Sequence, residues 1–392
     1  MSPSDDHILF VSHKYPPSTG GMEKQSFELI NQSALYIRVH TIIYDQRESI
    51  LKFFLDLNKR ILEKIKQHPE IKLIHFNDGL IGALSTFHRG YEHIKTVVTL
   101  HGLDLVFPLA VFQKKILPRF NKFDLIIAVS QATALAAKQR GLDEQKVRVV
   151  LNGVHALQPH KMENDISSIY SKYAFLEDRS PYFIVLGRAV KRKGFSWLMK
   201  NVIPELQGNF KLIMVGPFDF KPKWKEKLIG FLPKKLRHLV TLFLGFPSDQ
   251  ADIRKELERL RDKVIHLGKV PYQDLEVLLS SATAFVMPNI TVAGDMEGFG
   301  LVCLEASLAG TLVVASSIEG ISSAIGENNG IPLASMDRQA WISQLQCIIN
   351  NPEEYTSKAL QYQKYTAENY SWDKMAREYV DIFLGVLQQK NG

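Results

Sequence analysis

Short apolar runs rich in β-branched residues alternate with stretches of helical spacing along nearly all of the 392-residue chain. No other feature of the sequence restricts the fold as strongly. Strands of a parallel sheet are buried on both faces and read as near-continuous apolar runs, while the helices between them supply the crossover connections. The alternation therefore predicts parallel sheets that are covered by helices.

A polar, weakly patterned stretch separates the apolar runs into two series. The first series is HILFVSH, VHTIIYD, IKLIHFN, TVVTLHG, DLIIAVS and KVRVVLN, and the second is YFIVLGR, FKLIMVG, KVIHLGK, TAFVMPN and TLVVASS. A chain of this length usually needs more than one hydrophobic core. We predict an α/β protein with two doubly wound domains, residues 1–160 and 161–372, with a linker near 157–179. A last helix over 373–392 could pack on either domain, and packing back on the first is our working hypothesis.

The composition argues against several classes of protein. Only two cysteines occur, Cys303 and Cys347, which disfavours a disulfide scaffold and favours a reducing, cytoplasmic compartment. The chain has no apolar run of roughly 18 residues, and its N-terminus, MSPSDDHILFVSH, lacks the regions of a secretory signal. No G-x-G-x-x-G follows the first apolar run, which disfavours NAD-linked chemistry.

Glycines and cations follow two of the predicted strands. In HKYPPSTGGMEKQ, Gly20 and Gly21 precede a helical pattern that starts near Glu23. Glycine there allows the backbone to approach a ligand closely, although a flexible turn without a ligand explains the motif equally well. In GRAVKRKG, Arg188 and Lys193 could converge on a group with more than one negative charge.

We interpret the neighbouring Lys191 and Arg192 as part of a solvated surface turn, because that is what a run of charges usually forms.

The stretch DMEGFGLVCLEA places two glutamates around a glycine-rich turn. VMPN ends a predicted strand and a helix is expected from about Gly300 to Ala309, so Glu297 falls in the loop and Glu305 on the helix. The first amides of that helix are unpaired donors that suit an anion, and Glu305 could accept from two hydroxyls. A glycosidase acid and base pair is the alternative, as is a helix cap with a surface ion pair.

These motifs together resemble the retaining family 4 glycosyltransferases of the GT-B fold, over nearly the whole chain. EGFGLVCLE resembles the family's E-x7-E motif, and GRAVKRKG resembles its GR-x4-KG diphosphate motif. Gly20-Gly21 resembles its N-terminal glycine loop, His101 its donor-contacting histidine, and Asn152-Gly153-Val154 the NGV at its domain crossover. The resemblance implies two Rossmann-like domains that face a central cleft, the first on the acceptor side and the second binding a nucleotide sugar.

The resemblance also implies a role for each matching residue. Arg188 and Lys193 would neutralise the diphosphate, and Glu305 would hold the ribose. Glu297 and the backbone of 299–302 would hold the donor sugar, which His101 would contact. The implied catalytic residues are Arg188, Lys193, Glu297 and His101. The implied donor-binding residues are Gly20, Gly21, Gly187, Val270, Gly298, Phe299, Gly300, Leu301, Val302 and Glu305.

The same resemblance implies transfer of a sugar, UDP- or GDP-linked, to a hydroxyl of a glycan or lipid-linked acceptor, with retention and with neither a metal nor another cofactor. The loop PNITVAGDME is longer than the common PS-x2-E form and looks more like the family's lipid-directed mannosyltransferases. A nucleotide-sugar epimerase on the same scaffold and a catalytically silent sugar-nucleotide binder are the alternatives.

Residues 221–240, KPKWKEKLIGFLPKKLRHLV, mix lysines with aromatic and aliphatic residues. Such a mixture suits an anionic membrane surface, with Lys114, Lys115 and Arg119 of the first domain as further contacts. A solvated basic insert whose apolar residues pack on the domain is the competing interpretation. Nucleic acid is a weaker one, since no recognition motif accompanies the charge. We expect a cytoplasmic enzyme that is peripheral to the cytoplasmic face of a membrane.

Overall fold

The computed structural model describes residues 4–155, 172–173, 176, 180–219 and 248–389. The chain divides into two compact units. The first unit comprises Met1–Val154, Glu297–Leu301 and Tyr370–Gly392, and the second comprises His155–Met296 and Val302–Asn369. Most of the predicted linker and all of 221–240 lie outside the described residues.

The first unit is built on a six-stranded parallel sheet with the order β2-β1-β3-β4-β5-β6. Its strands are β1 (His7–Ser12), β2 (Arg38–Ile43), β3 (Ile71–Phe76), β4 (Lys95–Leu100), β5 (Leu125–Ala128) and β6 (Val147–Val149). Its helices are α1 (Gly21–Ser33), α2 (Ile50–Gln67), α3 (Gly79–Ser85), α4 (Leu103–Val106), α5 (Gln131–Gln139) and α16 (Trp372–Gln388). Each of the first six predicted apolar runs contains one of these strands.

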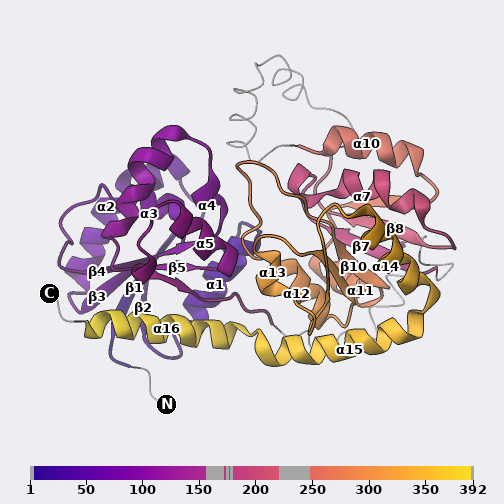
Figure 1. The fold of residues 1–392 in the computed structure, drawn as a ribbon. Helices are drawn as coiled ribbons and strands as arrows, with labels where there is room; N and C mark the ends of the chain where they lie inside the picture. The colour runs from indigo at the N-terminus through magenta and orange to yellow at the C-terminus, as the bar shows by residue number, and fades with distance from the viewer. Residues whose placement is uncertain (1–3, 156–171, 174–175, 177–179, 220–247, 390–392) are drawn as a thin grey trace. The chain divides into compact units, whose positions relative to one another are not determined.

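Helix α16 packs on the core of the first unit, as Figure 1 shows. Trp372, Tyr379 and Phe383 are fully buried against a cluster that includes Ile8 and Phe10 of β1. The N-terminus of α16 packs closely against Gly153, since a Cβ on Gly153 would come within 2.2 Å of the Ser371 carbonyl carbon. The NGV stretch therefore needs its glycine for the contact with α16, because any side chain would collide with backbone.

The second unit repeats the plan with a six-stranded parallel sheet of order β12-β11-β10-β7-β8-β9. Its strands are β7 (Tyr182–Leu186), β8 (Lys211–Val215), β9 (Val264–Gly268), β10 (Ala284–Met287), β11 (Val313–Ser316) and β12 (Ile331–Leu333). Its helices are α7 (Phe195–Asn201), α10 (Gln250–Arg259), α11 (Tyr272–Ser280), α12 (Leu301–Leu308), α13 (Ile321–Ala324), α14 (Arg338–Asn350) and α15 (Pro352–Asn369). The predicted α/β class with doubly wound parallel sheets is confirmed.

Strand β12 is the element that the sequence pattern missed. It has three residues, Ile331 to Leu333, with a proline in the middle and only half-buried side chains. A proline at an edge strand removes one ladder donor without breaking the sheet, so the apolar signal is too short to identify. The helix expected near Gly300 is α12, and it begins at Leu301.

Two further expectations concern the whole chain. Both cysteines are free, with Cys303 buried and Cys347 exposed. Within the described ranges, no helix is both long enough and apolar enough to cross a bilayer.

Candidate functional site

The second unit places two loops at the point where its strand order reverses. Strand β7 is flanked by β8 on one side and β10 on the other, so the chain leaves β7 and β10 in opposite directions. Ligands of open α/β sheets bind at this switch point, outside the carboxyl ends of the strands. GRAVKRKG follows β7 and the loop that starts at residue 288 follows β10, so both loops begin at this switch point.

The two loops at the switch point touch through their backbones. Ile290 N–H donates to the Arg192 carbonyl at 2.9 Å. Gly194 has a φ of 67°, and a Cβ at that position would come within 1.9 Å of the Pro288 carbonyl oxygen. A side chain would meet both torsional strain and a collision with backbone, so glycine is required for the close approach of the loops.

Lys193 and Arg188, the two side chains predicted to bind the diphosphate, differ in their surroundings. Lys193 is only 8% exposed, and its stem crosses Gly187, where a Cβ would come 3.3 Å from Lys193 Cε. Arg188 is exposed, and among the described residues its guanidinium has no hydrogen-bond or ion-pair partner. Arg188 is therefore available to an anion at the carboxyl end of β7, next to a lysine that packing holds in place.

Arg192 is a structural residue, and its interpretation as part of a solvated turn is wrong. Its side chain is 12% exposed and its Nε lies 3.1 Å from Asp295 Oδ1. The same carboxylate oxygen accepts from Met296 N–H at 2.9 Å. Arg192 thereby braces the long loop in front of Glu297. Lys191 fits the original interpretation better, since its side chain is 50% exposed and lies 3.9 Å from Asp252.

A buried carboxylate supports the loop between β7 and α7. Asp249 is 2% exposed and accepts from Ser196 N–H at 3.1 Å and Ser196 Oγ–H at 2.7 Å. Burial raises the pKa of Asp249 from 3.8 to about 6, although both hydrogen bonds from Ser196 act in the opposite direction. The sequence analysis did not identify Asp249.

The nucleoside side of the second unit lies around the start of α11. Val270, which the resemblance places against the base, is half-buried directly before Pro271 and α11. Tyr272 is 60% exposed, and after burial the charges of Glu276 and Glu305 are the next causes that raise its pKa. Glu305 on α12 therefore lies near the Tyr272 hydroxyl. A flat, exposed ring beside Val270 is a second candidate surface for a base, which the sequence analysis missed.

The Gly298 turn belongs to the first unit and lies against His101. A Cβ on Gly298 would come within 1.9 Å of the His101 carbonyl oxygen. Thr133 Oγ1–H donates to the Gly298 carbonyl at 3.5 Å, a long hydrogen bond. Phe299 is 3% exposed, so the middle of the turn is a packing residue, and any sugar contact from this position comes from its backbone.

His101 is held in one tautomer at the carboxyl end of β4. Its Nε2 lies 2.8 Å from the Asn77 carbonyl oxygen, which can only accept, so Nε2 carries the proton in the neutral ring. Asp104 Oδ2 accepts from His101 N–H at 3.0 Å and from Gly79 N–H at 2.9 Å. Nδ1 is then an acceptor, the form that suits a donor hydroxyl.

A second histidine at this edge was not predicted. His13 follows β1, and its Nδ1 donates to Asp78 Oδ2 at 2.8 Å, with both residues buried. Asp78 also accepts from Leu80 N–H at 2.9 Å and so caps α3. Burial opposes the charged carboxylate, but His13 and the backbone donors keep the pKa of Asp78 below its ordinary value. Polar residues directly after two strands were the signal for this pair.

Gly20 and Gly21 precede and begin α1 as expected. Gly20 has a φ of 166°, which any residue adopts, so its torsion does not demand glycine. A Cβ there would come within 2.3 Å of Glu23 Oε2, whereas one on Gly21 would meet nothing within 4 Å. Open space at Gly21 is consistent with close approach of a ligand, and also with a plain turn.

Two protein families match the chain in its two halves. The family described as "Glycosyl transferases group 1" matches residues 170–368, and "Glycosyltransferase Family 4" matches residues 8–156. The first of these matches covers about half of the chain, and it includes the loops at the β7 and β10 switch point.

Two curated proteins and one solved structure illustrate the similarity. An uncharacterized glycosyltransferase, MJ1607, of Methanocaldococcus jannaschii is 34% identical over 194 residues, 45% of this chain and 46% of that protein. The "GDP-mannose-dependent monoacylated alpha-(1-6)-phosphatidylinositol monomannoside mannosyltransferase" of Corynebacterium glutamicum is 24% identical over 165 residues, 41% of this chain and 43% of that protein. The chain thus spans less than half the length of either relative.

Crystal structures of similar fold cover nearly all of the chain. Anabaena Alr3699/HepE, solved in complex with UDP, has a TM-score of 0.71 at 18% identity and covers 97% of this chain and 100% of its own. At this identity the likeness concerns the fold, and it agrees with the GT-B plan of two doubly wound units.

Proposed function

The chain belongs to the group 1 glycosyl transferases, and we propose that it moves a sugar from a nucleotide-diphosphate sugar to a hydroxyl of a glycan or lipid-linked acceptor. The observation that supports this most is at the β7 and β10 switch point. There an exposed arginine without a partner among the described residues, Arg188, stands beside the buried Lys193. Two cations at the carboxyl edge of a parallel sheet suit a diphosphate.

Arg188 and Lys193 would serve the leaving group. As the bond between the anomeric carbon and the diphosphate oxygen breaks, negative charge grows on that oxygen, and donors already in place stabilise it. Packing across Gly187 limits the positions open to the Lys193 ammonium, so little reorganisation is needed during the reaction. This electrostatic role is the one that a divalent metal performs in other transferases, so we propose that transfer requires none.

Other residues would hold the sugar itself. His101, with its proton on Nε2, presents Nδ1 as an acceptor for a sugar hydroxyl. Glu297 would accept from further hydroxyls, and the amides of 299–302 would contribute donors. Glu305, on α12 near Tyr272, would hold the ribose, with Val270 against the base.

We propose that the transfer retains the anomeric configuration. The acceptor oxygen would bond to the anomeric carbon on the face from which the diphosphate leaves, and the departing phosphate oxygen would take the acceptor's proton. No carboxylate nucleophile is needed in such a step, which leaves both glutamates free for recognition. The buried His13 and Asp78 pair would then act by holding α3 and the end of β1 in place.

The relatives support a nucleotide-sugar donor but differ in its base. HepE has been crystallised with UDP and with UDP-glucose, whereas the corynebacterial mannosyltransferase uses GDP-mannose. We therefore propose a UDP- or GDP-linked donor. The longer loop after β10 and the acylated acceptor of the corynebacterial relative both favour a lipid-linked acceptor over a free glycan.

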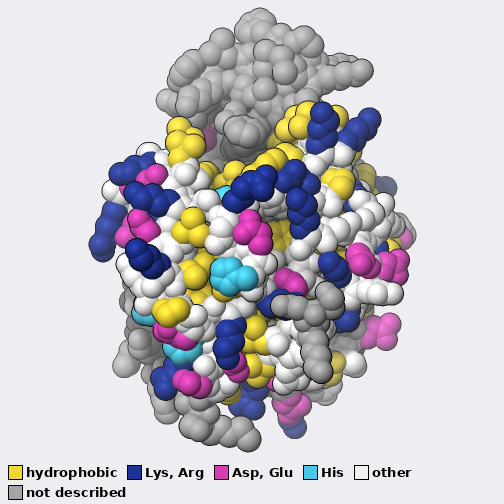
Figure 2. Space-filling model, turned by 90° about the vertical axis from the view of Figure 1, so that its left-hand side faces the viewer, with side chains coloured by type: hydrophobic (Ala, Val, Ile, Leu, Met, Phe, Trp, Pro, Cys, Tyr) yellow, Lys and Arg dark blue, Asp and Glu magenta, His cyan; other side chains and the backbone are white. Residues whose placement is uncertain are grey.

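A surface of the first unit fits an acceptor in an anionic membrane. Phe87, Leu109 and Val111 are 57%, 44% and 56% exposed. Lys114 and Lys115, which follow Val111 closely in the chain, are exposed too. Figure 2 shows yellow hydrophobic and dark-blue basic side chains sharing one face. Arg119 is less available than expected, because its Nη2–H donates to the Thr86 carbonyl at 2.7 Å and its guanidinium lies 4.1 Å from the Phe87 ring centroid.

Release of nucleotide diphosphate with and without acceptor tests the proposal. A thermal-shift panel of nucleotide diphosphates and their sugars first selects the donor, because a ligand that binds only the folded state raises Tm. A transferase releases diphosphate faster when a suitable acceptor is added. An epimerase forms a new nucleotide sugar without any acceptor, and a silent binder consumes no donor, so either result would refute the transferase.

A further inference from the structure

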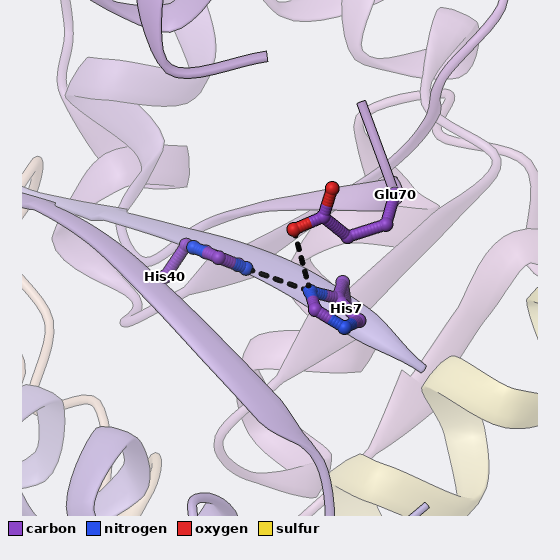
Figure 3. A group of neighbouring side chains, drawn as sticks. All are labelled: His7, His40 and Glu70. Atoms are coloured by element: carbon purple, nitrogen blue, oxygen red, sulfur yellow. Dashed lines mark hydrogen bonds and ion pairs between the residues drawn. The ribbon is translucent and has the colours of Figure 1, made fainter. Parts of the chain in front are cut away.

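Three polar side chains converge at the amino edge of the first sheet, away from the proposed transfer site. His7 Nδ1 lies 2.9 Å from His40 Nε2 and 3.4 Å from Glu70 Oε1. The ligand atoms of His7, His40 and Glu70 all lie within 4.8 Å of one another. Figure 3 shows the His40 and Glu70 side chains directed at the same ring nitrogen of His7.

The fold brings this cluster together from three segments of the chain. His7 begins β1, His40 lies in β2, and Glu70 directly precedes β3. His40 is in register with Leu9, and side chains two residues apart on a strand share a face, so His7 and His40 project from the same face. Ile8, on the other face, packs in the cluster that α16 completes.

Two further side chains lie beside the cluster, and one of them is hydrogen-bonded to it. His68, at the C-terminus of α2, has Nδ1 3.2 Å from Glu70 Oε1, and its ring centroid lies 4.2 Å from that of His40. Asp5 Oδ1 lies 3.9 Å from His7 Nε2, on the far side of the His7 ring. This carboxylate is exposed and beyond hydrogen-bond distance, so it adds negative charge beside the cluster without fixing the His7 tautomer.

We propose that His7 Nδ1, His40 Nε2 and the Glu70 carboxylate form a binding site for a divalent ion of the zinc class, with His68 positioning the carboxylate. Two imidazoles and one carboxylate are the donors that Zn²⁺ prefers over Mg²⁺ or Ca²⁺, which take oxygen ligands. Glu70 is exposed and both histidines are half-buried. An ion can therefore reach the site, and water can complete its coordination.

Two of the three separations between the ligand atoms fit this coordination, and the third pair, His40 and Glu70, lies within 4.8 Å. Ligand atoms about 2.1 Å from a zinc ion lie roughly 3.0 to 3.4 Å apart when the angles between them are about 90 to 110°. The observed separations of 2.9 and 3.4 Å are close to that range. Without an ion, one proton lies between His7 Nδ1 and His40 Nε2. Metal binding would move that proton to His40 Nδ1, the tautomer that leaves Nε2 free to coordinate.

The ion would have a structural role. It would tie β1 and β2 to the turn between α2 and β3, and those segments are far apart in the sequence. The transfer site is expected at the opposite edge of the sheet, about 20 Å away along a six-residue strand such as β1. Binding should therefore raise stability without being needed for transfer.

Equilibrium dialysis of the tag-free 392-residue chain against buffered Zn²⁺ tests the site. The wild-type chain and a His93→Gln control, whose histidine is exposed outside the cluster, should bind about one ion per chain. His7→Gln with His40→Gln should lose that binding by at least a hundredfold in affinity. His68→Gln should weaken it by roughly ten- to a hundredfold, as loss of a positioning partner does elsewhere.

Two further measurements decide between a metal site and a hydrogen-bonded histidine stack. Zn²⁺ should raise the Tm of the wild type and leave that of the double variant unchanged, provided that both fold alike without metal. Co²⁺ should give the visible absorption of a low-coordinate nitrogen site in the wild type alone. Binding that survives in the double variant would overturn the proposal, as would a wild type that binds no ion at micromolar Zn²⁺.

Discussion

Both units have a six-stranded parallel sheet, but the carboxyl edges of the two sheets have opposite chemistry. In the first unit, His101, His13 and Asp78 are buried and already engaged with neighbouring groups. In the second unit, Gly194 lets two loops approach closely, and Arg188 extends from them without a partner among the described residues. The first edge has its acceptors arranged in advance, while the second has charge available for an anion.

This difference separates two tasks that one doubly wound plan can support. An imidazole acceptor held in one tautomer, as in His101, suits hydroxyl groups, whose positions distinguish one sugar from another. Cations at a switch point suit a diphosphate, which is common to every nucleotide sugar. Substitutions at the second edge should therefore damage catalysis with any donor, whereas substitutions at the first should change the use of a particular sugar.

Arg188→Ala and Lys193→Ala should break the charged edge and have the largest effect. Each removes a cation that would stabilise the leaving phosphate, so turnover should fall by roughly a hundredfold or more, by analogy with loss of one transition-state donor. Lys191→Ala, half-exposed in the same loop, is the matched control and should stay near wild type. Steady-state kinetics measures the turnover of each variant, and unchanged melting curves show that the variants are folded. Near-normal turnover in both variants would contradict the assignment.

Asp249→Asn should alter the pH dependence of stability at the second edge. Because the pKa of Asp249 rises from 3.8 unfolded to about 6 folded, the folded state binds the proton more tightly. Its contribution is fully present below pH 3.8 and is lost as pH rises toward 6, by about 3 kcal/mol in total. The variant should lack this loss. Chemical denaturation from pH 4 to 7 measures it, and parallel curves for both proteins would refute it.

Glu305→Ala and Glu297→Ala should separate nucleotide binding from sugar recognition. Loss of a charged hydrogen bond to the ribose should weaken binding of free nucleotide diphosphate by about 1.5 to 3 kcal/mol in Glu305→Ala. Glu297→Ala should leave that affinity unchanged and reduce kcat/KM for the sugar donor. Calorimetry with the diphosphate alone and with the intact donor distinguishes the two. The reverse pattern would exchange the proposed roles.

His101→Ala should test the carboxyl edge of the first sheet and should have a smaller effect. One hydrogen bond from a sugar hydroxyl to Nδ1 is worth about 1 kcal/mol, so kcat/KM for the preferred donor should fall roughly five- to tenfold. Affinity for nucleotide diphosphate should not change. A donor that lacks the contacted hydroxyl should be used equally by wild type and variant. If the wild type uses every deoxy-sugar donor better than the variant does, the proposed contact between His101 and a sugar hydroxyl is wrong.

Lys114→Gln with Lys115→Gln should have the smallest effect, at the surface of the first unit. Each lysine near an anionic bilayer contributes about 1 kcal/mol, or roughly fivefold in vesicle affinity. Added salt should release the wild type, and neutral vesicles should not bind it. Lys223, Lys225, Lys234 and Lys235, outside the described residues, test the segment 221–240 separately in the same co-sedimentation. Binding unchanged by both sets of substitutions would exclude these anchors.

Local sequence was sufficient for the elements and for part of the candidate site. All eleven predicted apolar runs contain a strand. Burial on both faces requires apolar residues whichever strands lie on either side. Gly187, Arg188 and Lys193 could be selected as candidates because they directly follow such a run. The short edge strand β12, with Pro332 at its centre, left no comparable pattern.

Tertiary structure decided what each polar residue does. Arg192 and Asp295 are far apart in the sequence, and only the meeting of two loops makes them an ion pair. His7 and His40 lie in two different strands and Glu70 precedes a third, in a parallel sheet whose strand order the periodicity does not reveal. Apolar periodicity records which residues are buried, because burial depends on a residue's own surface. A partner across the sheet depends on topology, and therefore had to be seen in three dimensions.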